Sequence, residues 1–109
     1  MLLYFQDYTN NICVPTEAPL EASVWQALDI FNNISDDDGS YIGLVDEHQE
    51  TLQFMKYNKY VWLIEIPKPH LGGSYQGYFT KNKCKKIISE IFDGLPLSQV
   101  SGLSFEKYL

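Results

Sequence analysis

Two kinds of periodicity divide this chain into elements. Residues 2–8 are strand formers, and between residues 41 and 79 short apolar runs alternate with polar or Gly/Pro-bearing connectors. Connectors of this length join antiparallel neighbours, because parallel strands need a longer crossover. The pattern predicts one leading strand followed by a four-strand antiparallel meander, over residues 2–8, 41–45, 51–56, 60–66 and 74–79.

Helical spacing occurs in two segments. The first has Pro19 suited to its opening turn and predicts a helix over residues 19–33, with apolar side chains three or four positions apart: Leu20, Val24, Leu28 and Phe31. The second follows Thr80 as N-cap, stops at Gly94, and carries one apolar stripe: Cys84, Ile87, Ile88 and Ile91.

These elements predict one α+β domain over residues 1–109. We expect an antiparallel sheet of four to six strands in the order β-α-β-β-β-β-α, with two helices packed on it through Leu20, Val24, Leu28, Phe31, Ile87, Ile88 and Ile91. Residues 10–19 read as a connector, and residues 95–109 as a loop with room for one last short strand.

The third meander strand is predicted to be central. One face carries Trp62 and its alternate neighbours, and the other carries Val61, Leu63 and Glu65. Both faces are largely apolar, so we expect a cover on each side. Pro67 and Pro69 are expected to end this strand.

The charges are segregated along the 109 residues. From Met1 to Met55 there are ten acids and no Lys or Arg, whereas all eight lysines follow, against only four acids. A field of one sign steers association, so the pattern favours a basic protein partner over nucleic acid. No apolar run is long enough for a membrane span and no signal peptide is recognisable, which predicts a cytoplasmic protein with Cys13 and Cys84 as free, buried thiols.

The stretch NNISDDDGSYIGLVDE has the oxygen ligands of a calcium loop. With Asp36 in position one, Asp38, Ser40 and Glu47 occupy ligand positions. The sharp turn of that loop needs glycine where Tyr41 stands, and strands follow where a helix is required. The sequence therefore predicts a solvated turn and no metal.

The remaining candidates for chemistry are weak. The glycines of residues 72–77 lack the spacing of a phosphate loop and indicate a hairpin turn with close-approach positions. His48, His70, Cys13 and Cys84 are isolated, so no cofactor is inferred. Glu65 is expected to be bonded to a lysine or to backbone. The basic cluster at the start of the second helix is expected to be solvated or to hold an acid from the first half: Lys81, Lys83, Lys85 and Lys86.

The segment from Gly39 to Phe92 resembles the small immunity proteins of bacterial contact-dependent inhibition and polymorphic toxin systems. The resemblance rests on the acidic turn, the triplet Leu52, Gln53, Phe54, the Trp-bearing central strand, and the aromatic strand leading into a helix. It implies a non-enzymatic protein that binds the C-terminal domain of its cognate toxin in the cytoplasm and blocks it. Many such toxins are nucleases with basic grooves, for which an acidic surface is complementary.

The predicted binding surface consists of acids around the strand at residues 41–45, with one tyrosine anchor: Asp36, Asp37, Asp38, Tyr41, Asp46, Glu47 and Glu50. The free chain is expected to be a monomer or a weak dimer, bound to neither nucleic acid nor membrane. Two alternatives stay open. One is an enzyme or ligand-binding domain with a pocket around Glu65, His48 or His70. The other is a regulatory subunit, for example a homodimer through an apolar Val61 and Leu63 face.

Overall fold

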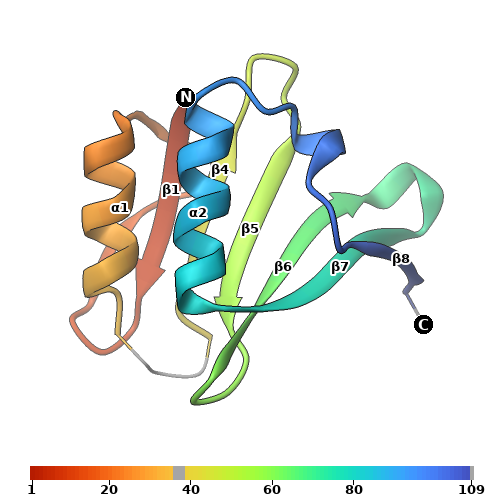
Figure 1. Ribbon diagram of the computed structural model, residues 1–109. Helices are drawn as coiled ribbons and strands as arrows, with labels where there is room; N and C mark the ends of the chain where they lie inside the picture. Colours follow the sequence, from red (N-terminus) through yellow and green to blue (C-terminus); the bar gives the residue numbers. More distant parts are fainter. Residues whose placement is uncertain (36–38, 109) are drawn as a thin grey trace.

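The strands form one antiparallel sheet whose neighbours follow almost the order of the chain. The computed structural model describes residues 1–35 and 39–108, and within them the sheet order is β2-β1-β4-β5-β6-β7-β8, with β3 paired to β1 (Figure 1). The strands are β1 (Leu2–Asp7), β2 (Ile12–Val14), β3 (Leu20–Glu21), β4 (Tyr41–Val45), β5 (Thr51–Lys56), β6 (Val61–Lys68), β7 (Gly73–Thr80) and β8 (Ser104–Lys107). The antiparallel meander is confirmed, and the strands outnumber the predicted four to six.

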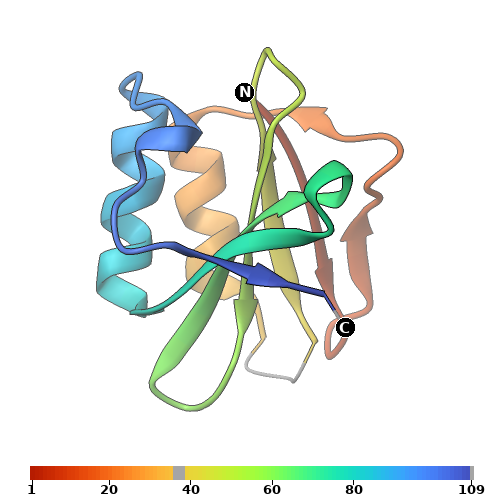
Figure 2. The ribbon, with the colours of Figure 1, turned by 90° about the vertical axis from the view of Figure 1, so that its right-hand side faces the viewer.

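Two α-helices cover one face of this sheet. Helix α1 (Val24–Asn33) and helix α2 (Lys81–Phe92) lie on the same side, as Figure 2 shows, and the short helices η1 (Pro69–Leu71) and η2 (Leu97–Gln99) lie in connections. The α+β prediction is therefore confirmed. No helix in the described part of the chain has the length and apolar character needed to cross a bilayer.

The core lies between the helices and the middle strands. Phe31 of α1 is fully buried, with its ring centroid 4.7 Å from that of Trp62 on β6 and 5.7 Å from that of Phe54 on β5. Helix α2 buries the predicted stripe: Cys84, Ile87, Ile88 and Ile91. Alternate residues of β5 and β6 point toward the helices, so the Trp62 face of β6 and the Phe54 face of β5 form the core.

The prediction that the first helix begins at Pro19 is wrong. Helix α1 begins at Val24, because Ser23 closes a capping box: its hydroxyl accepts from the backbone N–H of Gln26, whose side chain accepts from the N–H of Ser23. Leu20 lies in β3 opposite Leu3 and is exposed, so it does not pack as a helix residue.

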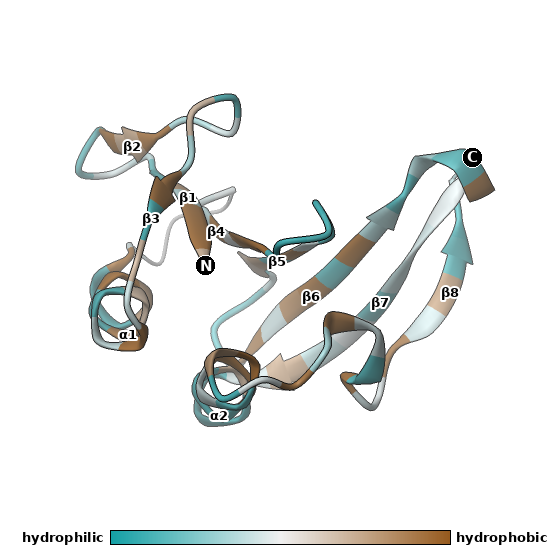
Figure 3. Cartoon of the chain, turned by 90° about the horizontal axis from the view of Figure 1, so that it is seen from above, coloured by the Kyte–Doolittle hydropathy of each residue, from teal (hydrophilic) through white to brown (hydrophobic). Residues whose placement is uncertain are grey.

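Three further expectations need correction. The connector at residues 10–19 contains an edge strand, β2, which pairs with β1. Strand β6 continues through Pro67 to Lys68, because β5 pairs with β6 only as far as Glu65 and leaves that side free beyond it. The Val61, Leu63 and Glu65 face of β6 has no helix over it (Figure 3).

Candidate functional site

The fold places the acidic half of the sequence on one side of the molecule. Residues 1–55 build β1 to β4, α1 and nearly all of β5, and these strands are neighbours in the sheet. Because the sheet follows the chain order, the described acids of that half lie on or beside these elements, whereas Lys68 and Lys107 lie on β6 and β8. The lysine-rich helix α2 packs beside α1, where Lys81 bonds to the carbonyl oxygen of Asn32. The charge segregation of the sequence is thus kept along the order of the strands, and the lysines of α2 interrupt it on the helix-covered side.

Three predicted binding acids lie in the tight turn between β4 and β5. The Asp46 carboxylate accepts from the backbone N–H groups of His48 and Glu50, each at 2.9 Å. Glu50 forms a 2.6 Å ion pair with Lys68 on β6. Glu47 is highly exposed, with only a 3.7 Å approach to the imidazole of His48. Asp46 and Glu50 therefore shape the turn, and Glu47 offers its charge to solvent.

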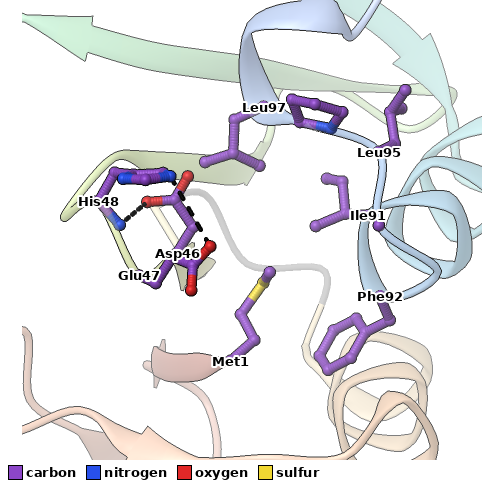
Figure 4. A pocket seen from close by; sticks show the side chains of 10 residues that line it. Met1, Asp46, Glu47, His48, Ile91, Phe92, Leu95 and Leu97 are labelled. Atoms are coloured by element: carbon purple, nitrogen blue, oxygen red, sulfur yellow. Dashed lines mark hydrogen bonds and ion pairs between the residues drawn. The ribbon is translucent and has the colours of Figure 1, made fainter.

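Two pockets flank this turn. The first, about 370 Å³, lies between Met1, Glu47 and His48 on one side and the C-terminal end of α2 on the other (Figure 4). The second, about 630 Å³, shares Asp46 and His48 with it and adds Lys68 and an apolar wall. Neither pocket is lined by Glu65 or by a cysteine, so Glu65 and His48 are not brought together in them.

The rest of the predicted surface lies elsewhere. Tyr41 opens β4 and is half-buried, at the opposite end of that strand from the turn of Glu47. Its ring centroid is 6.1 Å from that of Tyr4. Asp36, Asp37 and Asp38 lie outside the described residues. The predicted set is thus split between the two ends of β4.

Several other residues weighed in the sequence have structural roles. Ser40, which occupies a ligand position of the rejected calcium loop, is buried and accepts from the backbone N–H of Tyr8, and Glu47 lies beyond the far end of β4. Gly72 has φ 71° after η1, as a hairpin turn requires. Lys81 donates to the carbonyl oxygen of Asn32 at the C-terminal end of α1, where the helix dipole favours a cation.

The thiol prediction is half confirmed. Cys84 is buried, as expected, and burial raises its pKa to about 12. Cys13 lies on β2 and is exposed, which contradicts the expectation of a second buried thiol. It is exposed because β2 is an edge strand with no helix against it.

Across the uncovered face of the sheet runs a row of polar side chains, here called the central row. Tyr4 lies opposite Gly43, Gly43 opposite Gln53, Gln53 opposite Glu65, and Glu65 opposite Gln76. The Tyr4 hydroxyl donates to Gln53 Oε1 at 2.8 Å, passing over Gly43. Side-chain hydrogen bonds therefore join β1 to β5 and β6 to β7 within this row.

Glu65 is the charged member of the central row. Its Oε2 accepts from the hydroxyl of fully buried Ser74 at 2.9 Å and from the amide of Gln76 at 3.1 Å. Its partners are therefore side chains, rather than the expected lysine or backbone. Burial raises the pKa of Tyr4 to about 12, with further contributions from Tyr41 and then from the charge of Glu65.

Tyr4, Gln53 and Gln76 were not candidates from the sequence. The signal that could have found them is the alternation in β5 and β7, which puts Gln53 and Gln76 on the face opposite the core. What the alternation does not give is the register that aligns them with Glu65. Comparison with known proteins finds no family model, no curated protein and no solved structure that matches this chain.

Proposed function

We propose that this chain is a cytoplasmic immunity protein that binds a basic toxin domain, such as a nuclease, and blocks its activity. The observation that carries the proposal is the one-sided charge: the segment without Lys or Arg, residues 1–55, folds into adjacent strands and one helix. A basic nucleic-acid groove is complementary to such a surface, which competes with phosphate for it. The resemblance of residues 39–92 to immunity proteins points to the same class.

The predicted acids contribute unequally in this proposal. Glu47 is the most available of those described, because Asp46 and Glu50 are held by backbone N–H groups and by Lys68. Asp29 on the exposed side of α1 and Glu17 before β3 belong to the same acidic half. Their role is long-range steering, which raises the association rate more than the final affinity.

The test is co-expression with the C-terminal domain encoded by the reading frame immediately upstream. We expect a stable complex on size-exclusion chromatography, loss of the domain's toxicity, and an association rate that falls as salt rises. Glu47→Lys should slow association several-fold, and Lys107→Glu, on the basic half, should not. An isolated domain that forms no complex with this chain, or remains fully toxic in one, would overturn the proposal.

A second candidate is binding of a small ligand in the larger pocket beside the turn. Its volume of about 630 Å³ lies in the range of small-molecule sites, with Lys68 and His48 as polar groups over an apolar wall of Ile66, Leu97 and Val100. Saturable chemical-shift changes confined to these residues on screening small metabolites would favour it over toxin binding. Changes spread over the sheet face would not.

A further inference from the structure

The uncovered face of the sheet has an apolar strip beside the central row. In register, Tyr41 lies opposite Met55, Met55 opposite Leu63, and Leu63 opposite Tyr78, which we call the apolar row. Tyr78 is 54% exposed, and its ring packs edge-on against Tyr57 with centroids 4.7 Å apart. Both helices lie on the other side of the sheet (Figure 3). A partly exposed apolar strip of this kind, rimmed by polar groups, is typical of an interaction surface.

Glu65 presents one carboxylate oxygen to this surface in a fixed orientation. Its Oε2 is occupied by Ser74 and Gln76. Its Oε1 accepts no hydrogen bond from any residue in the described ranges, and no buried side-chain oxygen there lacks a partner, so Oε1 reaches solvent. The carboxylate is thus held in place by one oxygen and open at the other, which is the arrangement a cation from outside would use.

Every charged side chain that the register puts on this face of the described strands is acidic. These residues are Glu21, Glu65 and Glu106. The lysines on the strands alternate to the opposite face: Lys56 is opposite core residue Trp62, while Lys68 and Lys107 are each opposite Gly73. The face therefore lacks an internal cation for Glu65.

We propose that this open face is the docking surface for the basic partner, and that an arginine side chain of the partner binds Oε1 of Glu65. The inference rests on the proposed function and names the surface through which it would act. Arginine fits because its planar guanidinium bonds a carboxylate while lying against aromatic and apolar groups, here the apolar row. The turn of Glu47 steers the partner, and the open face holds it.

The charge of this face argues against two other occupants. A phosphate backbone would meet acids and no strand lysine on this face of the described residues, and would be repelled. A second copy of the chain would bring together two surfaces whose charged strand side chains are all acidic in the described residues, because an isologous dimer pairs each patch with itself. The homodimer considered from the sequence is disfavoured for this reason.

The test uses short random peptides displayed on phage and selected against the folded protein, with counter-selection on Glu65→Gln. We expect arginine to be enriched, and selected peptides to bind Glu65→Gln at least about tenfold more weakly by fluorescence anisotropy. Replacing the peptide's arginine by citrulline should cause a similar loss. Glu106→Gln, on the same face at the edge strand, is the matched control and should bind as the parent does. Equal losses for both variants, or none for Glu65→Gln, would overturn the assignment.

A second variant covers the case in which Glu65→Gln loses its fold. Leu63→Lys places a cation at a half-exposed position beside Glu65 and should abolish arginine-peptide binding; retained binding would overturn the proposal. The two proposals fail separately. If Glu65→Gln and Leu63→Lys both still form the toxin complex, the open face is not the docking surface, and the immunity function stands. If arginine peptides require Glu65 for binding but no toxin complex forms, the docking surface stands, and the immunity function is rejected.

Discussion

The ring of Tyr4 occupies the space above Gly43, its partner across the β1–β4 pair. A Cβ atom added at Gly43 would overlap the ring and its hydroxyl, which continues on to Gln53. Glycine is required here by its neighbour, since its φ angle is not in the left-handed region. An aromatic ring over a strand glycine compensates for the missing side chain and fixes the register of the two strands.

Gly43→Ala should therefore destabilise the protein by about 1–3 kcal/mol, through overpacking against Tyr4. Urea unfolding measures the loss. The same substitution in a Tyr4→Leu background should cost less, because the smaller side chain leaves room for the methyl group. An identical cost in both backgrounds would show that the ring is not the obstacle.

Ser23→Ala should lower stability by about 1 kcal/mol, because it removes the hydroxyl that accepts from the Gln26 N–H at 3.2 Å. Ser23→Gly is the control, since glycine at an N-cap costs only a few tenths of a kcal/mol. Thermal unfolding of the three proteins distinguishes these effects. If alanine and glycine behave alike, the capping box does not stabilise α1.

Asp7 should make the fold sensitive to acid. Hydrogen bonds from Ser35, together with those from Asn10, lower the pKa of this buried carboxyl to about 2 from 3.8, against the effect of burial. Because the pKa of Asp7 is lower in the folded state than in the unfolded state, its ionised carboxylate stabilises the fold at pH values above the unfolded-state pKa. This contribution to the free energy of unfolding disappears as pH falls from about 4 to about 2. Asp7→Asn should be less stable than the parent by about 1–3 kcal/mol at neutral pH.

The pH dependence is the decisive readout for Asp7. The stability gap between parent and Asp7→Asn should narrow as pH falls through that window, measured by urea unfolding at each pH. Glu17→Gln, at an exposed position, is the matched carboxyl-to-amide control. A gap that stays constant down to about pH 2 would contradict the role of the charge.

The two thiols should differ in reactivity toward a disulfide reagent such as DTNB. Cys13 is exposed and should react rapidly in the native protein, whereas Cys84 is buried with its pKa raised to about 12, so it holds little thiolate. Cys84 should react only after unfolding. In the Cys13→Ser variant the fast phase of the DTNB reaction should vanish. A fast phase that persists in this variant would show that Cys84 becomes accessible because α2 opens readily.

Local patterns predicted the parts of the fold that local chemistry determines. The strands at residues 41–45 and 51–56 were predicted with the correct first and last residues. Helix α2 begins after Thr80 and ends before Gly94, as expected. Strand β2 was not predicted, because its three residues between asparagines and a proline are too few to show an alternation of apolar and polar positions. The start of α1 was misplaced because the helical spacing at Leu20 outweighed the capping box at Ser23, which was readable.

The candidate site was less predictable, because it depends on distances between elements. Tyr41 and Glu47 are close in sequence, yet the extended strand β4 separates them. Glu65 and Gln76 are far apart in sequence and become neighbours only through the register of β6 on β7, which the turn around Gly72 sets. Sequence spacing gives the face of each side chain, whereas the pairing of strands decides which side chains meet.

A sheet that keeps chain order turns the segregated charges into a permanent electric dipole. The described acids of residues 1–35 and 39–55 lie toward its negative pole, and the lysines of β6 and β8 lie toward the positive one. In the field of a basic partner such a molecule rotates before any surfaces touch, so its orientation is selected at a distance. At low ionic strength the same dipole favours head-to-tail alignment of copies, and at about 0.1 M salt its field is screened beyond a Debye length of about 10 Å.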